Sequence, residues 1–183
     1  MMIEGNRKGL EESGSRFLWS LKRRENSDRE ERKYFEGFLE MTNGIGRVMG
    51  WAPQAAVLAH PAVGGFVSHC GWNSTMESAW FGVPMAAFPM HAEQQLNAFY
   101  LVKEMGMAFD YQMDFTGEKP PESVGWEVIA AAIRRLMAEE GGSGVRRKVE
   151  EMGRKAREAL MEDGSSYNAL TLFIEDVMRN IDN

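Results

Sequence analysis

The feature that most constrains this chain is a short apolar run that ends in a glycine turn and leads into a helix. The run extends from Phe66 to Cys70, has the length of a buried strand, and is followed directly by Gly71. Such a turn points backbone N–H groups and the positive end of the helix dipole at the carboxyl edge of the sheet. The stretch therefore predicts either a phosphate-binding site or an ordinary capped helix, and the spacing alone favours neither.

The helix after this turn has recognisable boundaries. Ser74 stands three residues before Glu77, as in a capping box, and Gly82 is a typical helix stop. The apolar run from Val83 to Phe88 predicts a second buried strand, and a short helix is predicted upstream from Gln54 to His60. Two strand-turn-helix units therefore follow each other.

Polar side chains gather around the glycine turn. His69 stands at the tip of the predicted strand, and Asn73 and Ser74 add donors at the start of the helix. A lone histidine at a strand end is about twice as often a satisfied structural residue as a ligand, so both interpretations stand at this point.

Residues 51–94 resemble the plant secondary-product glycosyltransferase box, the donor-binding signature of plant UDP-sugar-dependent glycosyltransferases. The box is present in full, without an insertion, and the motifs that carry the resemblance are WAPQ at 51–54, HPAVGGFVSHCGWNS at 60–74, Gly-Val-Pro at 82–84 and Glu-Gln at 93–94. Flanking motifs extend the resemblance over nearly the whole chain from about Gly9 onward.

The resemblance implies ten ligands for a UDP-sugar, which are Trp51, Ala52, Gln54, His69, Trp72, Asn73, Ser74, Glu77, Glu93 and Gln94. Trp51 corresponds to the residue that stacks on the uracil, a role that needs a large flat face. The backbone of Ala52 is expected at the uracil edge, and Gln54 beside the base and ribose. His69 corresponds to a donor to the pyrophosphate.

The resemblance also assigns the helix start and the sugar end of the site. Trp72, with Asn73 and Ser74, falls at the phosphate-facing positions, although a tryptophan there could equally be a core residue. Glu77 corresponds to the carboxylate that accepts from both ribose hydroxyls, with a capping-box glutamate as the alternative.

Glu93 and Gln94 correspond to the pair that reads the hydroxyls of the sugar. The family more usually has aspartate where this chain has Glu93, which is a longer arm. Glutamine at position 94 is associated with glucose donors and histidine with galactose. The implied donor is therefore UDP-glucose, a substrate, with no further cofactor.

Composition and charge argue against several other classes of partner and site. A net charge of −6 and a pI near 5.2 argue against nucleic acid or an anionic membrane as partners. The single cysteine, Cys70, excludes an intrachain disulfide and is typical of a reducing cytosol, where we expect the protein. We expect no signal peptide, no membrane span and no metal site, because His60, His69, Cys70 and His91 have no recognised ligand spacing.

Further elements are predicted around the box. Residues 1–13 are weakly helical, interrupted by two glycines, and residues 16–21 form a strand buried by Phe17, Leu18 and Trp19. Residues 22–33 form a solvated charged loop, residues 35–41 an apolar-faced segment, and residues 47–51 a strand that delivers Trp51 to its loop.

Helices dominate after the box. A helix over 94–105 has Leu96, Phe99 and Tyr100 on one face, ends at Gly106 and precedes a strand over 108–111. From about residue 121 to 181 three helical stripes are expected to be core; the last helix is capped by Ser166, and its stripe consists of Leu170, Phe173, Ile174, Val177 and Ile181.

These elements predict an α/β fold with a doubly wound, parallel, Rossmann-like sheet and ligands at its carboxyl edge. The resemblance identifies this fold as the C-terminal domain of the two-domain glycosyltransferase fold called GT-B. We expect residues 1–183 to form a single N-terminally truncated domain that lacks the first, central strand. Two sheet edges would then face each other across a gap, or the domain would rearrange.

The reaction that the resemblance implies is transfer of glucose from UDP-glucose to a hydroxyl or carboxyl of a small plant metabolite, with inversion. Such a transfer needs a base, which in this family is a histidine of the N-terminal half, so no catalytic residue is assigned here. We therefore expect the chain alone to be inactive. The alternatives are a catalytically silent nucleotide-sugar-binding fragment, the product of a truncated gene or gene model, or an interaction module that docks on a full-length relative.

Overall fold

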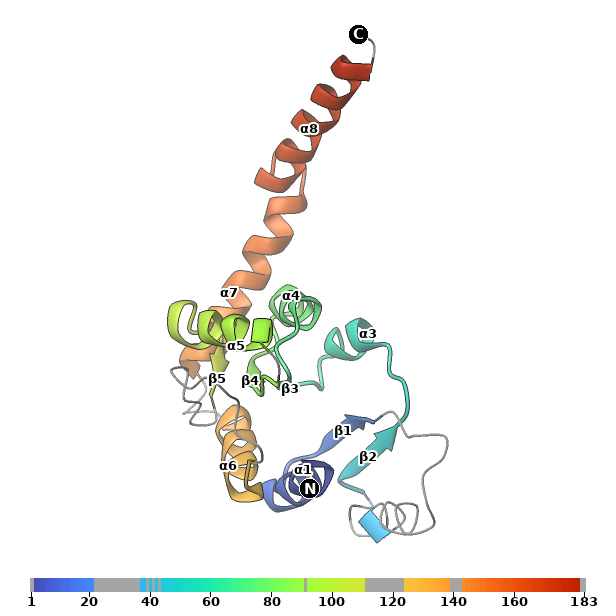
Figure 1. The fold of residues 1–183 in the computed structure, drawn as a ribbon, viewed down its shortest axis with the longest axis vertical. Coiled ribbons are helices and arrows are strands. Elements are labelled where there is room, and N and C mark those ends of the chain that lie inside the picture. Colours follow the sequence, from blue (N-terminus) through green and yellow to red (C-terminus); the bar gives the residue numbers. More distant parts are fainter. Residues whose placement is uncertain are drawn as a thin grey trace.

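The computed structural model describes residues 2–21, 37, 38, 40, 42, 44–90, 92–110, 124–138 and 143–181. In these residues, parallel strands alternate with helices, as the sequence predicts (Figure 1). The described strands form two separate sheets, one with the order β1–β2 and one with the order β3–β4–β5, and every strand pair is parallel. The α/β class is confirmed.

The three-stranded sheet carries the larger core. It consists of β3 (Phe66–Ser68), β4 (Met85–Ala87) and β5 (Ala108–Phe109). Successive residues of a strand point to opposite faces, so Met85 and Ala87 pack on one side and Ala86 on the other. All three residues of β4 are buried, because helices lie on both faces of this central strand.

Several helices form these two covering layers. On the Met85 side lie α5 (Ala92–Phe99), the π-helical turn η1 (Tyr100–Glu104) and α7 (Ser143–Leu160), which contribute Ala98, Leu101 and Val149 to the core. On the Ala86 side lies α6 (Trp126–Met137), which contributes Leu136. The C-terminal helices α7 and α6 thus pack on opposite faces of the sheet.

The two-stranded sheet is held by aromatic packing. Phe17 of β1 (Phe17–Ser20) pairs with Gly46 of β2 (Gly46–Met49). The ring of Phe17 occupies the space where a side chain at Gly46 would lie, and it stacks on Phe38 at a centroid distance of 5.7 Å. Trp19 meets the fully buried Phe38 edge-on, at 5.9 Å. The aromatic rings therefore anchor this smaller sheet.

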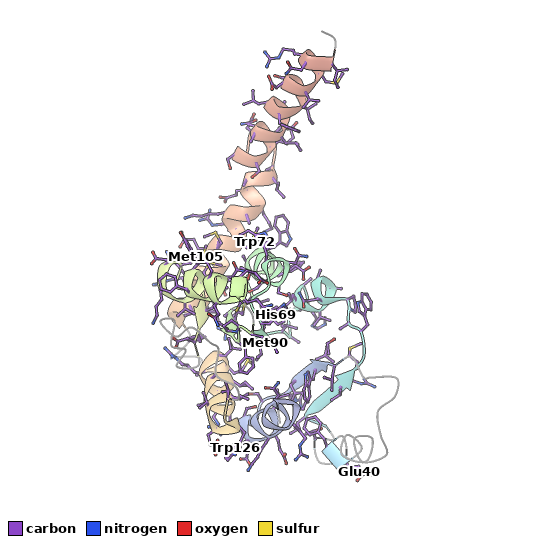
Figure 2. All side chains as sticks on the ribbon, viewed as in Figure 1. Glu40, His69, Trp72, Met90, Met105 and Trp126 are labelled. Atoms are coloured by element: carbon purple, nitrogen blue, oxygen red, sulfur yellow. The ribbon has the colours of Figure 1, made fainter. Side chains whose placement is uncertain are left out.

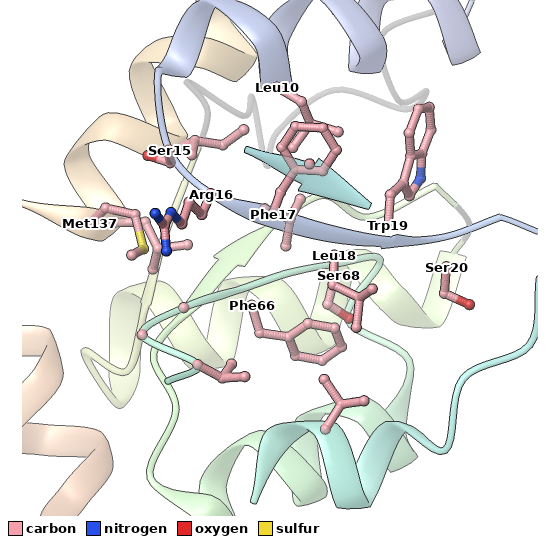
Figure 3. A pocket seen from close by; sticks show the side chains of 18 of the residues that line it. Leu10, Ser15, Arg16, Phe17, Leu18, Trp19, Ser20, Phe66, Ser68 and Met137 are labelled. Atoms are coloured by element: carbon pink, nitrogen blue, oxygen red, sulfur yellow. The ribbon is translucent and has the colours of Figure 1, made fainter. Parts of the chain in front are cut away.

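A cavity of about 1120 Å³ separates the two sheets, and residues of both β1 and β3 line it. Leu18 is predicted to be buried, but it is 45% exposed because it points from β1 into this cavity. Figure 3 shows it on the side of Phe66, opposite the rings of Phe17 and Trp19. The predicted gap between two sheet edges is therefore present.

Helix α1 (Met2–Ser13) packs against α6 through its glycines (Figure 1). A Cβ at Gly9 would lie 2.5 Å from Cγ2 of Ile129, and one at Gly5 would lie 3.3 Å from the Val124 carbonyl oxygen. The sequence predicts these glycines as interruptions of a weak helix. Their actual effect is to let α6 approach α1 closely.

The apolar face of Leu96, Phe99 and Tyr100 in the helix after the box is not the side that packs on the sheet. Leu96 and Tyr100 are 63% and 56% exposed, whereas Ala98 and Leu101 are buried. The side that faces the sheet is the one that packs on Met85 and Ala108, and it carries Ala98 and Leu101. Gly106 ends the segment as predicted, with φ of 61°.

The final helix, α8 (Ser165–Ile181), follows α7 as a rod that leads away from the sheets (Figure 1). None of its described residues is buried, so the predicted core stripe is wrong: Leu170, Phe173, Ile174, Val177 and Ile181 are all exposed. The helix begins at Ser165 rather than after a cap at Ser166. The 3.6-residue period of its apolar residues indicates an amphipathic helix, but it does not identify the surface that packs on the apolar face.

Some predicted elements lie outside the described residues. These are the charged loop over 22–33, most of the segment over 35–41, and residue 111 at the end of the predicted strand over 108–111. Among the helices that the structure describes, none combines the length and the apolar character needed to cross a bilayer.

The contact between α7 and α4 (Trp72–Phe81) gives a test of the packing. A Cβ at Gly153 would lie 2.8 Å from the carbonyl oxygen of Ala79, so Gly153→Ala should lower the free energy of unfolding by about 1–3 kcal/mol. Gly144 lies in the same helix with open space around it, and Gly144→Ala should instead raise stability by up to about 1 kcal/mol. Urea denaturation measures both; equal effects would contradict this packing.

Candidate functional site

The turn between β3 and α4 is built around a buried cysteine with an unusual backbone. Cys70 has φ of 62°, in the left-handed region that few residues other than glycine adopt, and its side chain is fully buried. Its N–H donates to Oγ of Ser68 at 3.2 Å, and its sulfur lies 3.7 Å from that of Met85. This conformation ends β3 at Ser68, two residues before the predicted end of the strand.

Helix α4 starts earlier than the capping pattern predicts. Its N-cap is Gly71, and the N–H of Thr75 donates to the Gly71 carbonyl at 3.0 Å. Ser74 therefore lies inside the first turn and is not the cap. The N–H groups of residues 72–74 precede the first helical hydrogen bond, so they face out of the helix end with the positive pole of its dipole.

The imidazole of His69 lies over this helix end. A Cβ at Gly71 would lie 2.5 Å from Nε2 of His69, so the glycine is needed to admit the ring. Its φ of −60° makes no such demand, because any residue can adopt it. His69 is exposed and lines the cavity together with Met90, and Figure 2 labels both near the end of the sheet.

Three predicted site residues meet on the side of α4. Nε2 of Gln54, from α3 (Gln54–Leu58), donates to Oε2 of Glu77 at 2.8 Å and to Oγ of Ser74 at 3.1 Å. Ser74 is buried and Glu77 half-buried. The capping-box role of Glu77 is therefore contradicted, because its partner is a side chain of another helix.

The two tryptophans present free ring surface. Trp51 is 81% exposed on the loop after β2, and Ala52 follows it into the lining of the cavity. Trp72 is 63% exposed at the start of α4, which excludes the core interpretation (Figure 2). Asn73 beside it is exposed as well. Such apolar faces are available for stacking.

Glu93 and Gln94 form a separate group on the first turn of α5. Glu93 is exposed. Gln94 is buried, and its Oε1 accepts from the N–H of Met90 at 2.9 Å, which ties the end of the β4 loop to α5. Gln94 thus also has a structural duty that the sequence motif does not reveal.

Two residues outside the predicted set shape the turn. Oγ of Ser68 accepts a hydrogen bond from the Cys70 N–H, and Nδ2 of Asn97, in the last turn of α5, donates to the Cys70 carbonyl at 2.9 Å. Asparagine is unfavourable inside a helix. Its position inside the predicted helix over 94–105 is the sequence signal that could have identified Asn97.

The ionisable side chains of this region include two carboxylates, Glu77 and Glu93. Residues 51–94 contain no lysine or arginine. Among the described residues, no group of three or more His, Cys, Asp or Glu side chains could hold a metal ion. An anion at the start of α4 would therefore be held by backbone N–H groups, the helix dipole and His69.

The chain is similar to known proteins over most of its length. It matches the family model described as UDP-glucoronosyl and UDP-glucosyl transferase over residues 6–116. It is 50% identical over 184 residues to UDP-glycosyltransferase 71B2 of Arabidopsis thaliana and 52% identical over 177 residues to UDP-glycosyltransferase 71A15 of Malus domestica. These alignments cover 94% and 92% of the chain but 38% and 37% of the relatives.

Solved structures give the same result. A transferase from Siraitia grosvenorii in complex with UDP aligns with a TM-score of 0.84 at 43% identity, over 97% of this chain and 43% of that one. UGT71G1 of Medicago truncatula, complexed with UDP-glucose, aligns with a TM-score of 0.82 at 44% identity, over 96% of this chain and 36% of that one. The chain thus spans less than half of each of these two structures.

The buried thiol provides a probe of the turn. Burial raises the pKa of Cys70 from its ordinary 9.0 to about 11, so the neutral thiol is favoured in the folded state. Its contribution to stability is fully present below pH 9 and is lost as the pH rises toward 11. At pH 8 a thiol reagent should label Cys70 only as fast as the protein unfolds, and at once in guanidinium. Rapid labelling of the native protein would contradict the buried turn.

Proposed function

This chain belongs to the UDP-glucoronosyl and UDP-glucosyl transferase family, and on that premise we propose that residues 51–94 form a UDP-glucose site. The observation that carries the proposal is the Glu77 carboxylate, which Gln54 holds on α4 within a few residues of the phosphate-facing helix start. One carboxylate accepts two hydroxyl donors, as vicinal ribose hydroxyls require. Ribose and diphosphate then lie along one helix.

The other predicted residues complete this arrangement. Trp51 stacks on the uracil, with the Ala52 backbone at the edge of the base. The diphosphate lies at the start of α4, where Trp72, Asn73 and Ser74 supply N–H groups and His69 donates from its ring. Glu93 and Gln94 read the sugar, with glucose as the preferred donor.

Because the chain spans about 38% of the length of the curated relatives named above, we assign it donor binding rather than complete catalysis. Transfer of glucose to a hydroxyl or carboxyl of a small acceptor needs an acceptor pocket and a base. We propose that residues outside these 183 supply both, and that the chain acts as a single UDP-sugar-binding domain. The second candidate is a silent nucleotide-sugar-binding domain, which the same site supports.

Glu77→Ala should weaken UDP binding by about 5- to 150-fold, which corresponds to about 1–3 kcal/mol for donors left without an acceptor. Isothermal titration calorimetry of the purified chain measures this effect. Glu162→Ala, at an exposed position between α7 and α8, is the control and should bind as the parent does. Unchanged affinity of a folded Glu77→Ala variant would show that Glu77 only holds α3.

A transfer assay separates donor binding from catalysis. The chain, incubated with UDP-glucose and a phenolic acceptor, should bind the donor without forming glucoside. Thermal unfolding with millimolar UDP-glucose should show the binding, since a hundredfold excess over Kd stabilises the native state by about 2.7 kcal/mol. Glucoside formation above the buffer rate would contradict the assignment of acceptor binding and base to other residues.

A further inference from the structure

The peptide bond between Cys70 and Gly71 joins the end of the strand to the cap of α4, and its orientation is fixed from a distant element. Asn97 lies in the last turn of α5, 27 residues further along the chain, and its Nδ2 donates to the Cys70 carbonyl at 2.9 Å. The C=O and N–H of a trans peptide point in opposite directions because the unit is planar. A hydrogen bond to the carbonyl therefore also directs the Gly71 N–H, away from Asn97.

This support matters because the backbone at Cys70 is strained. A residue other than glycine is strained in the left-handed region and persists there only where the surroundings enforce it. Ser68 accepts the hydrogen bond of the Cys70 N–H, and the Cys70 sulfur packs on that of Met85, so these two contacts fix the backbone nitrogen and the side chain. Asn97 fixes the carbonyl of Cys70, where the chain enters α4.

We propose that Asn97 is a positioning residue for the diphosphate half of the site. It touches no substrate: it acts through the Cys70–Gly71 peptide, which carries the N–H of Gly71, the N-cap of α4. The inference rests on the proposed function, because it assumes that a diphosphate binds at this helix end. The uracil and ribose are bound by Trp51 and Glu77, on other parts of the site, so Asn97 should not affect them.

The test compares ligands that differ only in their phosphates. Asn97→Ala should weaken UDP about tenfold, as expected for N–H groups that lose their alignment to a charged group, and should leave uridine binding within twofold of the parent. Affinities for both ligands are measured by calorimetry or by competition, and circular dichroism checks the fold. The ratio of UDP to uridine affinity is the readout, because a merely structural loss would weaken both ligands together.

Two further variants control the interpretation. Asn97→Asp keeps the shape of the side chain but cannot donate when ionised, so it should show the same selective loss of UDP affinity. Asn168→Ala removes a comparable bond, from Nδ2 of Asn168 to the Asp163 carbonyl at 3.1 Å, far along the chain in α8, and should change neither affinity.

The outcomes separate this inference from the proposed function. If the parent chain binds no UDP, the proposed function fails. If the parent binds UDP but the folded Asn97→Ala and Asn97→Asp variants keep the ratio of UDP to uridine affinity, the inference alone fails. Should both variants lose the fold, the inference is also overturned, since the bond would then hold the domain together rather than direct one peptide.

Discussion

The left-handed conformation of Cys70 is the constraint on which the site depends. The chain passes from β3 to α4 between Ser68 and Trp72. The turn is made at a buried, non-glycine residue, and its strain of about 1–3 kcal/mol is offset by partners on three elements. The start of α4 is therefore a product of tertiary packing.

The same packing links the two halves of the proposed site. Gln54 bridges α3 to the side of α4, while His69 and Ala52 line the cavity between the sheets. The cavity brings the open edges of β1 and β3 next to the loop that carries the exposed Trp51. Nucleotide binding should consequently be sensitive to how the smaller sheet is held, through the aromatic contacts of Phe38.

Local signals in the sequence predicted the element order well, and long-range packing explains most of what they missed. Gly82 and Gly106 mark helix ends because both adopt φ above 60°, a local property of glycine. The capping pattern predicts a helix start at Ser74 instead of Gly71, because it carries no information on the buried turn before it. Leu18 and the apolar stripe of α8 are predicted to be buried, because periodicity shows that an apolar face exists but not which surface packs against it. Similarly, the family resemblance predicts that Gln54 and Glu77 are ligands. The hydrogen bond between them is visible only in the folded structure.

The most direct test of the account is amide mapping by NMR with UDP and with uridine. If the β3–α4 turn seats the diphosphate, the largest amide shifts that UDP causes beyond those of uridine should fall on residues 71–74. Residues of the uracil loop around Trp51 should respond to both ligands alike. Shifts from the phosphates that fall elsewhere, with residues 71–74 unaffected, would contradict the claim that this turn is the phosphate seat.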